Sequence, residues 1–232
     1  MKKGFTLSEV LITLGVIGVV AAMTLPVLIQ NYRNNVAETR LKKFYSAFNQ
    51  AIQRSVAENG DYSGWDYPFV DLKDDDGNYI GPADQIDNQF RRYIGQYLNI
   101  AKREVITNSG NGLEQNLYYL ADGGAFTVAP HQGRTITFYP TNPKKCLETD
   151  TSLQAGICSF PFLFAPHWNS YGGVFSHKGL EPYYYGWGDQ KDESLYTNKT
   201  YGCKNGNGNF CTAIIARNGW KIPKDYPRKI KF

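Results

Sequence analysis

The sequence is poor in the residues that catalysis and charge-driven binding use most. It contains only three histidines, His131, His167 and His177, and none stands in a nucleophile elbow, a Walker loop or an H-E-x-x-H zinc motif. The net charge is only +4, and charged residues make up 20% of the 232 residues, which excludes an acidic-tail protein and a disordered polyelectrolyte. The composition therefore favours a structural or binding protein over an enzyme.

Glycine and proline are absent from residues 27–59, and this absence predicts one uninterrupted helix. Apolar and small residues recur there at intervals of three and four, which is the pattern of a helix with one buried face. They are Leu41, Phe44, Tyr45, Phe48, Ala51, Ile52, Ser55 and Val56, with Arg40, Lys42, Lys43, Asn49, Gln50, Gln53 and Arg54 on the other side. We expect a helix over residues 5–59, ending near Glu58, and a globular head domain over residues 60–232.

Charge is also absent from residues 10–32. The 20 residues from Val10 to Ile29 would span about 30 Å as a helix, which is the thickness of a bilayer core. Lys2 and Lys3 precede the run, so the positive-inside rule leaves the amino terminus in the cytoplasm and the head outside it. Four cysteines agree with an oxidising destination.

Three interpretations compete for this segment. A secretory signal cleaved before Met23 has a suitable small-residue site at Val20-Ala21-Ala22, but Glu9 and the apolar residues beyond the cut argue against it. A plain single-span anchor fits the length and leaves Glu9 unexplained.

The third interpretation comes from residues Gly4-Phe5-Thr6-Leu7-Ser8-Glu9 and the apolar run behind them. This stretch resembles the class III signal of type IV pilins and of the pseudopilins of type II secretion systems. The resemblance implies that a prepilin peptidase removes the leader, residues 1–4, by cutting between Gly4 and Phe5, and methylates the new amino group of Phe5. It extends to Gly15, Gly18 and Pro26, and it covers about the first 35 residues.

Glu9 has two possible roles. Thr6 and Glu9 have the T-x-x-E spacing of a capping box, in which each side chain bonds to the backbone of the other. In the family that the sequence resembles, this acid is thought to pair with the amino group of residue Phe5 on a neighbouring subunit. Such a pair would neutralise two charges in an apolar bundle and set the axial register of a filament.

Gly15, Gly18 and Pro26 are the other expected assembly residues. The two glycines permit close approach of helices, although their spacing is not that of a G-x-x-x-G motif. Pro26 removes one helical hydrogen bond, so we expect a kink or local melting there. This is either an ordinary feature of a membrane helix or a weak point that lets a filament helix bend.

In the head domain, the clearest strand signals are residues 116–121, 124–129 and 134–139. Asp122-Gly123 forms a two-residue hairpin turn in this prediction, and the three strands form an antiparallel meander that covers the helix stripe. We also expect a short helix from about Ile86 to Ile100 and a further strand from Phe210 to Arg217.

The four cysteines allow three disulfide connectivities. Cys146 with Cys158 and Cys203 with Cys211 is favoured, because each pair closes a short loop that contains glycine. A zinc site is the less favoured alternative, since the spacings lack C-x-x-C pairs.

Two segments suggest weaker binding sites. Asp74 and Asp76 lie in an acidic turn that matches part of a calcium loop. Leu72 and Ala83, however, stand where two of the calcium ligands belong. A solvated turn is therefore favoured, and no cofactor is expected. Aromatic residues between Phe160 and Trp187 could stack on sugar rings or bases, but packing in a loop-rich core is favoured. They include Trp168, Tyr171, Tyr183, Tyr184, Tyr185 and Trp187.

The carboxy-terminal tail is basic, with Lys221, Lys224, Arg228, Lys229 and Lys231 against one acid, Asp225. It could contact DNA or an acidic surface, but a solvated tail is favoured and nucleic acid is an unlikely partner.

Together these patterns predict an α+β protein in which a long amino-terminal helix, membrane-spanning in its first half, packs on an antiparallel sheet with disulfide-bonded carboxy-terminal loops. The function they favour is that of a filament subunit. Its expected partners are other pilin-like subunits, a prepilin peptidase, the inner-membrane assembly platform and membrane lipid. A secreted or membrane-anchored glycan-binding module is the first alternative, and a secreted hydrolase is the second.

Overall fold

The computed structural model describes Gly4 and residues 6–66, 83–107, 112–129, 134–150, 154–165, 179–184 and 192–232. Its main element is helix α1, Leu7–Asn59, which has 53 residues and continues without a break through Pro26. Gly60, at φ 77°, ends the helix in a backbone conformation that favours glycine. The predicted single helix is confirmed, and local melting at Pro26 is not observed.

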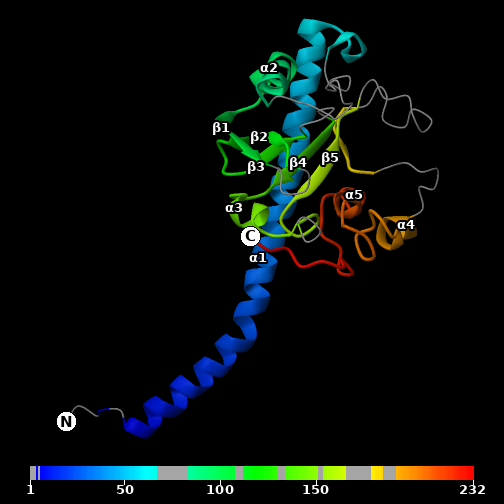
Figure 1. Cartoon of the computed structure of the whole chain (residues 1–232). Helices are drawn as coiled ribbons and strands as arrows, with labels where there is room; N and C mark the ends of the chain where they lie inside the picture. The colour runs from blue at the N-terminus through cyan, green and yellow to red at the C-terminus, as the bar shows by residue number, and fades with distance from the viewer. Residues whose placement is uncertain are drawn as a thin grey trace.

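The two halves of α1 have different surroundings. In Figure 1 the amino-terminal part projects away from the head and bends from the line of the part that packs on it. Within the described part of the chain, α1 is the one helix long and apolar enough to cross a membrane, and its most apolar stretch is wholly exposed. Burial begins at Ala37 and follows the predicted stripe. The buried residues are Ala37, Glu38, Leu41, Phe44, Phe48, Ala51, Ile52 and Ser55.

The head contains a six-stranded antiparallel sheet whose strands lie in sequence order. They are β1 (Ile100–Thr107), β2 (Glu114–Leu120), β3 (Ala125–Val128), β4 (Thr135–Tyr139), β5 (Phe160–Leu163) and β6 (Glu181–Pro182). Strands β2, β3 and β4 are the predicted meander. The β2–β3 connection is residues 121–124 and not a two-residue turn, with Gly123 at φ 86°.

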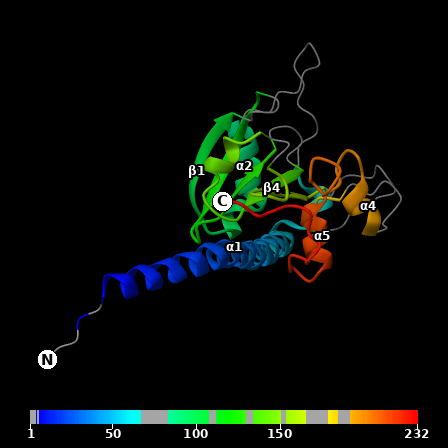
Figure 2. The ribbon, with the colours of Figure 1, turned by 90° about the horizontal axis from the view of Figure 1, so that it is seen from below.

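One face of the sheet covers the stripe of α1 through aromatic contacts, and Figure 2 shows the helix lying along that face. The ring of Phe44 stacks on Phe138 with centroids 4.3 Å apart and lies 5.5 Å from Phe126 and 5.6 Å from Phe162. Phe48 meets Phe126 edge to face at 6.1 Å. The abundant aromatic residues thus form the interface between helix and sheet.

The helices around the sheet are short. They are η1 (Tyr62–Gly64), α2 (Ala83–Tyr93), η2 (Gly95–Tyr97), α3 (Lys144–Leu147), α4 (Asp192–Thr197) and α5 (Cys211–Arg217). The predicted helix over 86–100 is wrong in its second half, because α2 ends at Tyr93 and β1 begins at Ile100. Tyr97 and Leu98 pack on the core from a 3-10 turn and the extended residue after it.

The predicted strand over 210–217 is also wrong, since residues 211–217 form helix α5. Helix α5 lies between two apolar clusters. Ile215 joins the main core, and Cys211, Ala213 and Ile214 join a second cluster. Five consecutive residues are therefore buried, and such a run carries no helical period that sequence analysis can detect.

Two disulfides restrain the carboxy-terminal half of the head. Cys146 bonds to Cys158 and Cys203 bonds to Cys211, the pairs that the short loops favoured. The guanidinium of Arg228 donates to the backbone carbonyls of Cys203, Ala155 and Gly206 at 2.7, 3.0 and 2.7 Å. The carboxy-terminal segment is thereby fixed to both disulfide loops.

Phe44 provides a test of the helix–sheet interface. Phe44→Ala removes a ring that is 3% exposed, so we expect the free energy of unfolding to fall by about 3–5 kcal/mol and the melting temperature by roughly 10 °C. Near-ultraviolet circular dichroism of the full chain in mild detergent measures this. The control Val105→Ala, at a side chain 46% exposed, should change the stability by about 0.5 kcal/mol or less. Equal losses in the two variants would contradict this packing.

Candidate functional site

The amino-terminal end of α1 has the predicted capping box. Thr6 is the N-cap, and its Oγ1 accepts a hydrogen bond from the backbone N–H of Glu9 at 3.3 Å. In return, Glu9 Oε2 accepts from the backbone N–H and from the hydroxyl of Thr6, both at 2.9 Å. Both bonds to the carboxylate use Oε2, so Glu9 Oε1 has no hydrogen bond from any residue that the structure describes.

Phe5 lies outside the described residues, so the expected cleavage site is seen only from Gly4. Gly4 is exposed, and a Cβ added to it would meet no atom within 4 Å. No described part of the chain therefore restricts the size of a side chain at that position.

The surface of the projecting helix is apolar all round. Leu7, Leu11 and Met23 are between 61% and 79% exposed. The hydroxyls of Thr13 and Thr24 donate to the carbonyls of Val10 and Val20 at 2.9 Å, so both are satisfied inside the helix. This surface suits hydrocarbon or an apolar helix bundle.

Gly15 and Gly18 are open positions on the same projecting segment. A Cβ added at either glycine would meet no atom within 4 Å. Neither glycine is needed for contacts inside the subunit, so both remain available for contacts between helices.

Where α1 reaches the head, the carboxy-terminal segment is attached to it by a buried acid that sequence analysis missed. Glu38 is 8% exposed and accepts hydrogen bonds from Lys221 Nζ at 2.7 Å and from the backbone N–H of Ile222 at 2.9 Å. Two turns before the buried part of the helix, Gln30 Nε2 donates to the carbonyl of Ile230 at 3.4 Å. Only the long-range contacts distinguish these residues from ordinary polar positions of a helix.

A groove of about 580 Å³ lies beside this attachment, between α1 and residues 219–221. Its wall includes Lys42, Ser46, Gln50 and Trp220. Trp220 has φ 64°, an uncommon backbone conformation for a bulky residue, and its ring lies 4.7 Å from that of Tyr45. The groove is open, and both polar and apolar side chains line it.

A second cleft, of about 370 Å³, lies on the sheet face that α1 does not cover. Among the residues that the structure describes, its walls carry hydroxyl and amide side chains and no charged group. They include Gln115, Thr127, Thr137 and Tyr139. Burial raises the pKa of the Tyr139 phenol to about 12, so this group stays neutral at physiological pH. The described residues of the cleft therefore supply neither an ionised nucleophile nor an ionised general base.

The other predicted binding residues do not form a site in the described structure. Asp74, Asp76, Trp168, Tyr171, Tyr185, Trp187 and all three histidines lie outside the described residues. The described aromatic residues of the 160–187 stretch are occupied by packing. Tyr183 and Tyr184 lie 6.5 and 5.5 Å from the ring of Phe210, and Phe160, Phe162 and Phe164 are fully buried. Within the described ranges, no group of three His, Cys, Asp or Glu residues is arranged to hold a metal ion.

Two family models match this chain. The model described as the prokaryotic N-terminal methylation motif, which is the class III prepilin signal, matches residues 1–25. The model described as a family of unknown function (DUF6613) matches residues 27–230. No curated protein and no solved structure matches the chain. The chain therefore belongs to the DUF6613 family of unknown function, and its amino-terminal motif makes it a type IV pilin-like precursor.

Proposed function

We propose that this chain is a structural subunit of a type IV pilus or of a type II secretion pseudopilus. The observation that carries the proposal is the continuity of α1. The methylation motif leads directly into an exposed apolar helix, and the same helix forms the centre of the head. Such a subunit is held in the cytoplasmic membrane before assembly, with its head outside the cytoplasm. In the filament, the apolar segments of many subunits replace the lipid around each helix.

In this proposal a prepilin peptidase cuts between Gly4 and Phe5 and methylates the amino group of Phe5. Within the described chain, a larger side chain at position 4 would meet no atom within 4 Å of its Cβ. In this proposal, glycine is needed there because the peptidase site admits no larger residue. The basic leader, with Lys2 and Lys3, stays on the cytoplasmic side.

Gly4→Leu tests the processing step. We expect the leader to remain on the chain, because a leucine side chain at the scissile bond does not fit a peptidase site shaped for glycine. Intact mass measurement of the membrane-extracted protein distinguishes the two forms. Gly18→Leu is the matched control, since it places the same side chain on an open glycine far from the scissile bond and should leave cleavage normal. A Gly4→Leu chain at the mature mass would contradict the assigned cleavage site.

We further propose that Glu9 pairs with the Phe5 amine of a neighbouring subunit. The capping box does not prevent this, because it uses Oε2 and leaves Oε1 without a hydrogen bond from any described residue. A carboxylate accepts several hydrogen bonds, so one side chain can close its own helix and bind the neighbour. Gly15 and Gly18 permit close helix contact, and Pro26 permits the bend that packing around a filament axis requires.

Glu9→Gln separates the two roles of this residue. Glutamine also serves in capping boxes, so helix α1, membrane insertion and cleavage should remain normal. Filament incorporation should fall sharply, because the neighbour's amine is left unpaired in an apolar bundle at a cost of several kcal/mol. The measurement is the amount of subunit in sheared filaments relative to the membrane fraction.

Two controls accompany this experiment. Glu148→Gln removes an exposed carboxylate of the head and should leave incorporation unchanged. Co-expression with the wild-type chain should partly restore incorporation of Glu9→Gln, because the variant still offers its own Phe5 amine. Wild-type incorporation of Glu9→Gln alone would leave Glu9 with the capping role only.

A further inference from the structure

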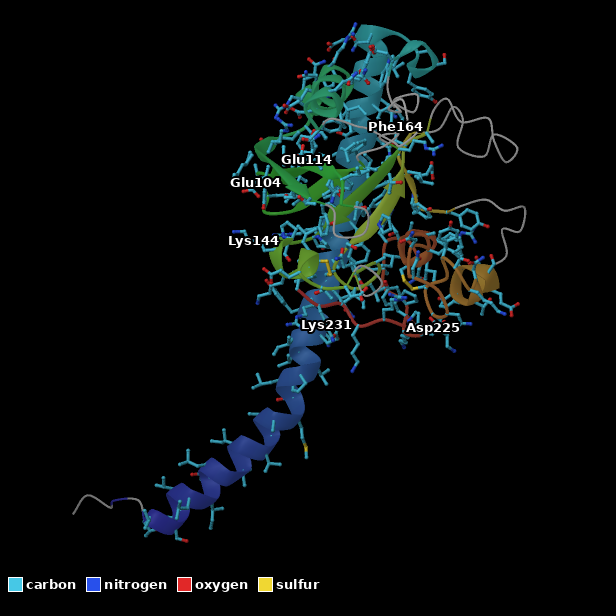
Figure 3. All side chains as sticks on the ribbon, in the orientation of Figure 1. Glu104, Glu114, Lys144, Phe164, Asp225 and Lys231 are labelled. Carbon is cyan, nitrogen blue, oxygen red and sulfur yellow. A yellow bond between two sulfur atoms is a disulfide. The ribbon has the colours of Figure 1, made fainter. Side chains whose placement is uncertain are left out.

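The basic carboxy-terminal segment lies at the end of the head from which α1 emerges. Figure 3 shows Lys231 and Asp225 at this end, where the helix leaves the head. Backbone hydrogen bonds and one buried side chain fix the carboxy-terminal segment in this position. The backbone N–H of Lys231 donates to Ile157 at 3.1 Å, the hydroxyl of Tyr226 donates to Gly156 at 2.7 Å, and Ile230 is fully buried.

The contact between Gln30 and Ile230 sets the level of this segment along α1. The predicted membrane span ends at Ile29, so the Ile230 carbonyl lies beside the first residue past the hydrocarbon. The polar headgroup region of a bilayer is roughly 5–8 Å thick on each side. Lys229 and Lys231 flank Ile230, and a lysine side chain is long enough to reach through such a layer.

The charge at this level is positive, and no described residue forms an ion pair with it. Lys224, Lys229 and Lys231 are exposed, and none forms an ion pair with any residue that the structure describes. Arg33, the first charged residue of α1 after the apolar run, likewise has no such pair. The one acid of this segment, Asp225, lies near Tyr196, where its charge contributes to raising the pKa of that phenol.

The other two cations of the segment are already used inside the fold. Lys221 pairs with Glu38, and Arg228 donates to three backbone carbonyls. The free positive charge is therefore concentrated on the three exposed lysines and Arg33.

We propose that Lys224, Lys229 and Lys231, with Arg33, bind the headgroups of anionic phospholipids where α1 enters the membrane. This inference rests on the membrane insertion of α1 and not on filament assembly. A lysine near an anionic bilayer surface strengthens association by roughly fivefold. The bound headgroups hold the head of the unassembled subunit against the membrane, and extraction into a filament releases them.

The test compares two variants with the same change of charge. Lys229→Gln/Lys231→Gln removes the two cations that flank Ile230. Lys42→Gln/Arg54→Gln removes two exposed cations of α1 about 18 and 36 Å farther along the helix from Gln30, and neither pairs with a described residue. The full chain is placed in nanodiscs with equal amounts of phosphatidylglycerol and phosphatidylcholine. Native mass spectrometry then measures the ratio of the two lipids that remain bound.

We expect the wild-type chain to retain phosphatidylglycerol in clear excess. The tail variant should lower the bound ratio by at least about fivefold, and the control variant should change it by less than about twofold. Lys229→Arg/Lys231→Arg should keep the wild-type ratio, since it preserves the charge. A melting temperature equal to that of the wild type shows that the tail variant is folded.

Three results would overturn the proposal. The first is an unchanged ratio of bound phosphatidylglycerol to phosphatidylcholine in the tail variant, and the second is an equal fall of this ratio in the control variant. The third is no phosphatidylglycerol excess on a wild-type chain whose α1 is inserted, as protection of α1 from protease shows. The tail variant is also tested for binding to a short DNA duplex. If it loses DNA binding while its lipid ratio is unchanged, the proposal is overturned and the lysines are assigned to nucleic acid. Filament incorporation is measured separately, so a subunit that binds the lipid but does not assemble contradicts only the proposed function.

Discussion

The backbone of α1 must remain hydrogen-bonded in two different solvents, and the rest of the structure is arranged around that requirement. In hydrocarbon, a single segment satisfies its own N–H and C=O groups only as a helix. The helix continues past this region, and from Ala37 onward its neighbours are the aromatic rings of the sheet. Because one continuous helix belongs to both surroundings, the head is joined to the membrane segment without an intervening loop.

The carboxy-terminal segment completes the head by fastening itself to α1. Glu38 accepts hydrogen bonds from residues 221 and 222, Trp220 packs on Tyr45, and Gln30 reaches Ile230. A nearly buried carboxylate such as Glu38 is stable only when it is paired and hydrogen-bonded, and both conditions hold here. The base of the head is therefore an ordered surface whose cations are presented at one level, at the point where the helix leaves it.

At the opposite end of α1, the capping box and subunit pairing are compatible explanations of Glu9. The cap uses one carboxylate oxygen, and the pairing that we propose uses the other. The cap also orients the side chain at the first turn of the helix, where the free amine of a processed neighbour is expected. The capping box that stabilises the helix of the isolated subunit can thus hold the Glu9 carboxylate in the orientation that subunit pairing uses.

The sequence by itself determined the elements whose patterns are local. The absence of glycine and proline and the apolar repeat determined helix α1 and its buried stripe. The turn residues and alternating strands determined the β2–β3–β4 meander, and the motif around Gly4 and Glu9 determined the family of the amino-terminal segment. These patterns are readable because neighbours within a few residues decide them.

Only the tertiary structure decided the elements that depend on distant partners. β1 is largely exposed at a sheet edge and β5 contains Pro161, so neither has a strand pattern of its own. Helix α5 is buried between two clusters, which removes its helical period. Asn49 was expected on the polar side of α1, yet it bonds to both backbone groups of Leu180. The bonds of Asn49 join residues 131 positions apart, and no local pattern encodes them.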